Sequence, residues 1–170
     1  MNAELREKAN QIKLVATDID GVWTDAKMHY TSDGVFMKSF STYDGMGAYF
    51  LLKNQFIVAM ITSEHENTDI LKSRANKLNI EEVYTHETEK IKRLKYLAEK
   101  YDLSQNRIAY IGDDINDLEA MRYAGLSAAP PGSPILKYEK VDFITERKSG
   151  EGAFRDLAEL ILESQNIKII

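Results

Sequence analysis

Short apolar runs rich in β-branched residues alternate along this chain with longer segments that carry apolar residues at helical spacing. A strand buried on both faces is apolar throughout, and such strands separated by helices are typical of a parallel sheet. We therefore predict a doubly wound, mostly parallel α/β fold with helices on both faces of the sheet. The predicted strands are residues 12–17, 56–62, 82–84, 107–111, 126–129 and 141–144, and the predicted helices are residues 46–54, 66–78, 87–101, 114–124 and 152–163.

One segment interrupts this alternation. Ser32-Asp33-Gly34 supplies turn residues between two short runs at 28–30 and 36–40, which predicts a β-hairpin inserted at about 26–42, directly after the first strand. Ligands of open α/β sheets bind beyond the carboxyl ends of the strands, so the insertion would lie over the site or beside it. It could be a decorated loop, a lid or an assembly arm.

The length and composition limit the organisation and the partners. A chain of 170 residues without repeat or linker fits one domain, residues 1–170. The net charge of −5 and the lack of a basic run exclude nucleic acid and anionic membrane as expected partners. The absence of cysteine excludes disulfides, thiolate zinc sites and a cysteine nucleophile. Residues 1–11 are polar and no stretch approaches the roughly 18 apolar residues of a membrane span, so we expect a soluble, cytoplasmic protein.

Asp18 and Asp20 come directly after the first predicted strand. Because side chains alternate along an extended chain, both carboxylates would project to one side. Two like charges this close repel unless a cation, a proton or a reacting group uses them. In the structural alternative, one aspartate caps the next turn and the other is solvated. Partner residues further along the chain decide between the two.

Polar residues also follow three later strands. Thr62 and Ser63 could hold phosphate oxygens at a helix N-terminus, or could simply cap that helix. Lys90 stands near the start of the next helix, where the helix dipole does not favour a cation, and a solvated lysine is the alternative. Residues 112–117 read Gly-Asp-Asp-Ile-Asn-Asp, a cluster that suits Mg²⁺. A nucleophile, a proton donor, a cation and a metal site are what phosphoryl transfer requires.

In this order, the motifs D-I-D-G-V-W-T-D, I-T-S, a lysine and G-D-D-I-N-D resemble the four motifs of the haloacid dehalogenase superfamily. The resemblance implies a Rossmann-like fold and an aspartyl-phosphate intermediate. It implies that Asp18 is the nucleophile and a metal ligand, and that Asp20 is the general acid and base, with its backbone carbonyl on the metal. Asp113 would complete the Mg²⁺ site, while Asp114 and Asp117 would orient metal waters and the active-site lysine.

The same resemblance assigns the phosphate to Thr62, Ser63 and Lys90. Lys90 would also keep the nucleophile ionised when phosphate arrives. The chain departs from the commonest pattern at Ala26, Ser63 and Ser149, where glycine is usual. Of these, the side chain of Ser63 matters most because it narrows the approach to the phosphate.

A closer resemblance covers almost the whole chain. The segments D-x-D-G-V-x-T-D, D-G-M-G, I-T-S-E and G-E-G-A-F-R-D are similar to the capless group of this superfamily that dephosphorylates 3-deoxy-D-manno-octulosonate 8-phosphate and nonulosonate 9-phosphates, in cell-surface sugar biosynthesis. The group implies Mg²⁺ dependence, no cap domain, and a homotetramer in which the hairpin of one subunit helps close its neighbour's site.

The choice between eight-carbon and nine-carbon sugar acids stays open. Glu64 together with Lys77 resembles the nonulosonate branch, although both residues are also ordinary helix-dipole partners. The resemblance makes Asp44, Arg74 and Arg155 further candidates for contact with the sugar or with a neighbouring chain.

Two alternatives of other classes remain at this point. The first is a phospho-receiver module, which also combines clustered aspartates with Thr and Lys on an α/β sheet. A receiver carries its acceptor on a middle strand and needs no acid or base two residues beyond it, so the role of Asp20 discriminates. The second is a catalytically idle tetramerisation module of a sugar-nucleotide pathway, which the intact motifs disfavour.

Overall fold

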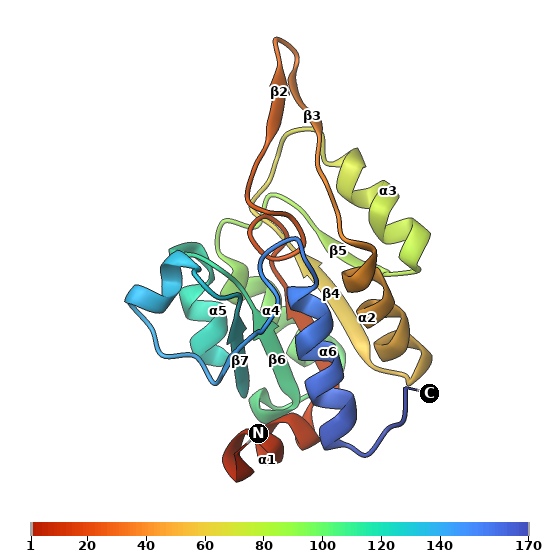
Figure 1. Ribbon diagram of the computed structural model, residues 1–170, viewed down its shortest axis with the longest axis vertical. Coiled ribbons are helices and arrows are strands. Elements are labelled where there is room, and N and C mark those ends of the chain that lie inside the picture. The colour runs from red at the N-terminus through yellow and green to blue at the C-terminus, as the bar shows by residue number, and fades with distance from the viewer. Residues whose placement is uncertain (1, 170) are drawn as a thin grey trace.

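A six-stranded parallel sheet forms the centre of the molecule, as the alternation of strands and helices predicts (Figure 1). The computed structural model describes residues 2–169. The strand order is β5-β4-β1-β6-β7-β8, so β1 lies between β4 and β6 at the middle of the sheet. The strands are β1 (Leu14–Thr17), β4 (Ile57–Ile61), β5 (Glu82–Tyr84), β6 (Ile108–Ile111), β7 (Leu126–Ala129) and β8 (Phe143–Ile144).

Helices cover both faces of this sheet. One apolar core joins one face to α1, α2, α3 and α6, and a second core joins the other face to α4 and α5. Along β1, Val15 belongs to the first core while Leu14 and Ala16 belong to the second, which explains why the run is apolar throughout. The helices are α1 (Ala3–Gln11), α2 (Thr42–Lys53), α3 (Asp69–Leu78), α4 (Lys90–Lys100), α5 (Leu118–Tyr123) and α6 (Ala153–Ser164), with short 3₁₀ turns η1 (Gln105–Arg107), η2 (Ile115–Asp117) and η3 (Pro134–Lys137).

Several elements differ from the sequence prediction; among them, α2 begins at Thr42 and not at residue 46. Helix α1 was not predicted; the side chain of Asn2 caps it by accepting a hydrogen bond from Leu5 N at 2.7 Å. The predicted helix 114–124 is divided into η2 and α5, because Asp114 and Asp117 form a reciprocal capping box around η2. Strand β8 is shorter than predicted, since the side chain of Asp142 accepts hydrogen bonds from Ser127.

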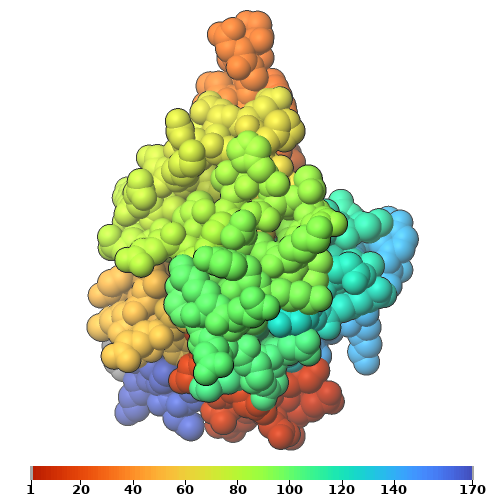
Figure 2. Space-filling model, turned by 180° about the vertical axis from the view of Figure 1, so that it is seen from behind, coloured from red at the N-terminus to blue at the C-terminus, as the bar shows by residue number. Residues whose placement is uncertain are grey.

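The predicted hairpin is present as β2 (His29–Thr31) and β3 (Gly34–Met37), an antiparallel pair separate from the main sheet. It projects from the side of the molecule where the carboxyl ends of the parallel strands lie, and its tip extends beyond the rest of the protein (Figures 1 and 2). Asn67 anchors it by donating from Nδ2 to Val35 O at 2.7 Å. Within residues 2–169 the hairpin is the only insertion at this end, and no cap domain is present. No helix in the same range is long and apolar enough to cross a membrane.

Candidate active site

Asp18 lies immediately beyond β1, and its backbone N–H continues the sheet by donating to Ile111 O at 2.9 Å. Its side chain is buried. The chain then turns at Gly21, whose φ is +96° and where an added Cβ would lie 2.0 Å from Asp113 Oδ2. Only glycine permits this backbone conformation and this approach, so Gly21 brings the loop after β1 against the loop after β6.

The ammonium group of Lys90 lies between two carboxylates. Its Nζ is 2.8 Å from Asp18 Oδ1 and 2.7 Å from Asp117 Oδ1, and its side chain is fully buried. Burial lowers the pKa of Lys90, but the two carboxylates outweigh this and raise it. Lys90 is therefore charged, although it occupies the first turn of α4, where the helix dipole opposes a cation.

Asp117 is fully engaged by protein donors. Besides Lys90, its Oδ1 accepts from the Tyr110 hydroxyl at 2.6 Å, and its Oδ2 accepts from Asp113 N at 3.0 Å. This carboxylate therefore positions Lys90 and the loop that carries Asp113. Tyr110 was missed by the sequence reasoning because it lies inside a buried strand, where an aromatic residue indicates only core.

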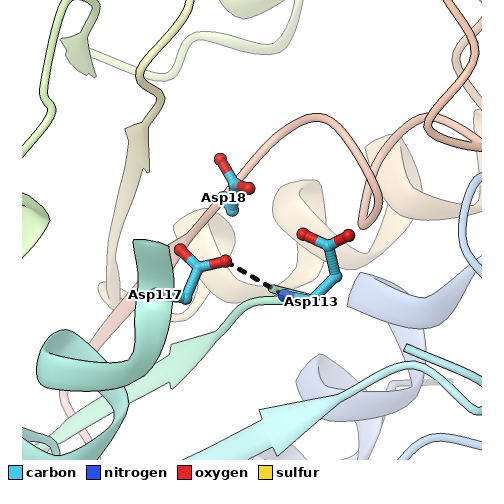
Figure 3. A group of neighbouring side chains, drawn as sticks. All are labelled: Asp18, Asp113 and Asp117. Carbon is cyan, nitrogen blue, oxygen red and sulfur yellow. Dashed lines mark hydrogen bonds between the residues drawn. The ribbon is translucent and has the colours of Figure 1, made fainter. Parts of the chain in front are cut away.

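One carboxylate oxygen from each of Asp18, Asp113 and Asp117 lies within 4.8 Å of the other two (Figure 3). Burial, with the charge of Asp117, raises the pKa of Asp18 well above its ordinary value and that of Asp113 to about 7; Lys90 opposes both shifts. A hard cation that takes carboxylate oxygens would relieve this repulsion. Because Asp117 is occupied by Lys90 and Tyr110, Asp18 and Asp113 are the side chains that fit such a cation.

The Asp20 carboxylate is held at both oxygens. Thr24 donates from Oγ1 to Asp20 Oδ1 at 3.2 Å, and Lys38 donates from Nζ to Asp20 Oδ2 at 2.6 Å. Lys38 also reaches Glu64 Oε2 at 3.0 Å. Lys38 follows β3 of the hairpin, and nothing in the sequence pattern signals that it returns to the aspartates.

A cavity of about 450 Å³ opens beside these groups. Residues from the ends of β1, β4 and β6 line its inner part, and the hairpin contributes two apolar side chains at its rim. The lining residues are Asp18, Asp20, Ala26, Met28, Tyr30, Thr62, Ser63, Glu64, His65, Glu66, Asp113, Asp114 and Asn116.

The candidate phosphate ligands after β4 have distinct surroundings. Thr62 is buried, and its Oγ1 accepts from Glu64 N at 3.1 Å, which leaves the hydroxyl proton for a ligand. The hydroxyl of Ser63 instead donates to Glu87 O at 3.0 Å, so only its backbone is free to face a phosphate. The structure thus brings Thr62, Ser63 and Asp18 to one cavity. Lys90 does not line this cavity; it is buried and contacts Asp18, which does.

The structure does not bring the remaining sugar-binding candidates to this cavity. Asp44 is buried and accepts from Arg155 N at 3.2 Å, between the starts of α2 and α6. Arg74 donates to Ser41 O at 3.0 Å, and Lys77 is exposed on α3. Within one chain, only Glu64 of the five candidates lines the cavity. The other four serve packing between helices or face solvent, which sequence spacing alone does not reveal.

Comparison with known proteins identifies the family of this chain. A family model described as haloacid dehalogenase-like hydrolase matches residues 53–154. The 3-deoxy-D-manno-octulosonate 8-phosphate phosphatase of Haemophilus influenzae is 34% identical over 161 residues, which are 95% of this chain and 88% of the relative.

Solved structures give the same result. The 3-deoxy-D-manno-octulosonate 8-phosphate phosphatase of Moraxella catarrhalis, crystallised in complex with a magnesium ion, a phosphate ion and a KDO molecule, has a TM-score of 0.91 at 35% identity, covering 98% of this chain and 94% of that one. The cobalt-bound enzyme of Haemophilus influenzae has a TM-score of 0.88 at 34% identity, covering 94% and 92%.

The chain therefore belongs to the haloacid dehalogenase-like hydrolases. Within that family it is a phosphoric monoester hydrolase, similar over nearly its whole length to the 3-deoxy-D-manno-octulosonate 8-phosphate phosphatases. The phospho-receiver alternative is excluded by this assignment.

Proposed function

We propose that this protein is a Mg²⁺-dependent phosphatase that hydrolyses the phosphate monoester of a 2-keto-3-deoxy sugar acid through an aspartyl phosphate. The observation that carries the proposal is the buried contact of 2.8 Å between Lys90 and Asp18, whose carboxylate lines the cavity. A buried carboxylate that contacts a buried cation, beside further carboxylates that suit a metal, is a nucleophile placed to attack phosphorus.

Mg²⁺ would be held by the carboxylates of Asp18 and Asp113 and by the backbone carbonyl of Asp20. When bound, it would neutralise charge on the phosphate oxygens. These ligands are hard oxygens, as Mg²⁺ requires. The structure of the Moraxella catarrhalis enzyme, whose alignment covers 98% of this chain, contains magnesium together with phosphate.

In the first half of the reaction, an Asp18 oxygen forms a bond to phosphorus while the bond between phosphorus and the sugar oxygen breaks. Asp20 gives its proton to the departing sugar oxygen. In the second half, Asp20 takes a proton from water, the water oxygen bonds to phosphorus, and the bond to Asp18 breaks to release inorganic phosphate. Thr62, the backbone at Ser63, and Lys90 hold the transferred group in place.

The substrate class rests on two observations that favour different chain lengths. The relatives from Haemophilus influenzae and Yersinia pestis are named as phosphatases of 3-deoxy-D-manno-octulosonate 8-phosphate, the phosphate ester of an eight-carbon sugar acid. Glu64 favours a nonulosonate 9-phosphate, such as KDN 9-phosphate. The carboxylate of Glu64 accepts hydrogen bonds from Lys38 Nζ at 3.0 Å and from the N–H groups of His65 and Glu66, each at 2.9 Å. These contacts fix its orientation, so an acidic side chain in a fixed position faces the sugar.

We also propose a homotetramer in which a neighbouring chain completes the site. A sugar acid carries a carboxylate that needs a cation, yet in residues 2–169 no lysine or arginine lines the cavity. The hairpin beside the cavity exposes Tyr30, Phe36 and Met37 to solvent at 60%, 54% and 42%. Apolar side chains gathered on a projecting hairpin are suited to burial against another subunit.

The function is tested by phosphate release from the 8-phosphate and the 9-phosphate, each with Mg²⁺ and with excess chelator. We expect turnover of at least one of them only with Mg²⁺, and the ratio of kcat/KM identifies the preferred sugar acid. Glu64→Arg then shows whether this position sets the ratio. Turnover of neither substrate would contradict the proposed substrate class, and undiminished turnover in chelator would contradict the metal.

A further inference from the structure

Lys38 is a buried cation that belongs to the hairpin and contacts the carboxylate assigned as acid and base. Its side chain is 4% exposed, less than Asp20 at 18% and Glu64 at 11%. An ammonium group removed from water is unfavourable unless carboxylates accept its hydrogen bonds. Both partners do so, at 2.6 Å and 3.0 Å, so the position of the ammonium group is fixed by the pair.

The contacts of Asp20 make Lys38 important for orientation. Thr24 holds Oδ1 at 3.2 Å, and Lys38 holds Oδ2 at the shorter distance of 2.6 Å. Thr24 lies in the same turn as Asp20, whereas Lys38 comes from the far side of the hairpin, 18 residues along the chain. The plane of the carboxylate is thus determined by one local contact and one contact from the insertion.

Contacts other than those of Lys38 already hold the hairpin against the body of the protein. Asn67 secures the hairpin at Val35 O, and Arg74 secures the segment after it at Ser41 O. Lys38 reaches inward between these two anchors. Its hydrogen bonds are to two groups that line the cavity, Asp20 and Glu64.

We propose that Lys38 is a positioning residue for the acid and base of this enzyme: it fixes the orientation of Asp20 and makes that orientation depend on the seating of the hairpin. The inference rests on the proposed function, because it assigns Asp20 the transfer of a proton to the sugar oxygen. When a catalytic acid is displaced from the leaving group by about 1 Å, the reaction can slow about a hundredfold.

Two substrates with different leaving groups distinguish a role of Lys38 in orienting Asp20 from a general structural role. The parameter kcat/KM reports the steps through phosphorylation of Asp18, in which Asp20 acts only as an acid. A sugar alkoxide needs that proton, whereas the phenolate of p-nitrophenyl phosphate departs without it. For Lys38→Met we expect kcat/KM to fall about 10- to 100-fold with the sugar-acid phosphate and less than about threefold with p-nitrophenyl phosphate.

Three variants complete the test. Asp20→Asn should show the same asymmetry between substrates, with a larger loss. Lys38→Arg, which also donates to two carboxylates, should recover most of the rate on the sugar-acid phosphate. Lys27→Met removes another hairpin lysine, which is 76% exposed and pairs with Asp25, and should change neither substrate. If Lys38→Met does not fold, Lys38→Gln, which is shorter and uncharged but polar, replaces it with the same expected asymmetry.

Equal losses on both substrates, no loss on either, or a faster reaction of Lys38→Met would each overturn the inference. A faster reaction would mean that the ion pair restrains Asp20 instead of aiming it. If the unmodified protein releases phosphate from p-nitrophenyl phosphate but from neither sugar-acid phosphate, the proposed substrate is wrong. The role of Lys38 is then decided with any alkyl phosphate that the protein turns over, compared with the aryl phosphate.

Discussion

The ammonium group of Lys90 lies 2.8 Å from the carboxylate of Asp18, and both side chains are withdrawn from solvent. Lys90 also neutralises Asp117, so one cation serves two buried carboxylates. This arrangement links the stability of the fold to the reactivity of the proposed nucleophile, because removal of the lysine leaves two like charges buried without a counter-charge.

Lys90→Met should therefore lose both activity and stability. Removing one partner of a buried ion pair destabilises a fold by about 3–5 kcal/mol, and saturating Mg²⁺ should recover part of this loss by supplying a cation. Chemical denaturation with and without Mg²⁺ measures both effects. Lys92→Met is the matched control, since Lys92 lies on the same helix as Lys90, is 75% exposed and pairs with Glu89. Equal stability of the two variants would contradict the role of Lys90.

Gly21→Ala should weaken the response to Mg²⁺. The added methyl group would meet Asp113 Oδ2 at 2.0 Å, at a φ of +96°, and would displace a proposed metal ligand. We expect the Mg²⁺ concentration for half-maximal rate to rise about tenfold or more. Gly132→Ala is a control for backbone strain alone, because its φ is +82° and nothing lies within 4 Å of the added atom. An unchanged Mg²⁺ requirement in Gly21→Ala would remove Asp113 from the metal site.

Asp44 should make the protein less stable as the pH rises from about 4 to 7. Burial raises the pKa of Asp44 from 3.8 to about 7, outweighing the backbone hydrogen bonds from the start of α6. In that window the folded chain binds the proton that the unfolded chain has released, so the free energy of unfolding falls by at most about 1.4 kcal/mol per pH unit.

Asp44→Asn removes this contribution and should flatten the decline. Urea denaturation of both proteins at about pH 5 and about pH 7 measures it, and Asp18 and Asp113 contribute equally to both profiles. Parallel profiles would show that Asp44 is ionised in the folded state at about pH 5.

We expect the hairpin to form contacts that hold the tetramer together. Replacing Tyr30 and Phe36 by serine removes two apolar side chains that are 60% and 54% exposed, and should shift the protein from a tetramer to smaller species with a higher KM. Sedimentation velocity gives the mass. Tyr138→Ser is the control, because Tyr138 is 63% exposed at the end of η3, away from the hairpin. A tetramer that survives the double substitution would leave the hairpin without a role in assembly.

The parallel sheet could be predicted from the sequence because its strands are buried on both faces and therefore apolar throughout, as β1 and β6 show. Helix α1 could not, because it packs through few residues and buries only Ala9. The ends of the predicted strands also located Asp18, Thr62 and Asp113 correctly at one edge, since parallel strands bring their carboxyl ends together.

Lys38 and Tyr110 could not be located in this way. Each acts across the fold, Lys38 on Asp20 and Tyr110 on Asp117, and residue spacing holds no information on a hydrogen bond that depends on tertiary packing. For the same reason Arg74 and Arg155 look like ligand-binding arginines in the sequence, while the structure places them against Ser41 and Glu159.

The most direct test of the account is to find the phosphoryl group on Asp18. In Asp20→Asn with acetyl phosphate and Mg²⁺, the first step needs no acid while the second lacks its base, so the phosphoenzyme should accumulate. Mass spectrometry of the acid-quenched, digested protein should show one phosphoryl group on the peptide that contains Asp18, and none after Asp18→Asn. A phosphoryl group on another residue, or phosphate release in the Asp18→Asn enzyme at the rate of the unmodified protein, would contradict the central claim.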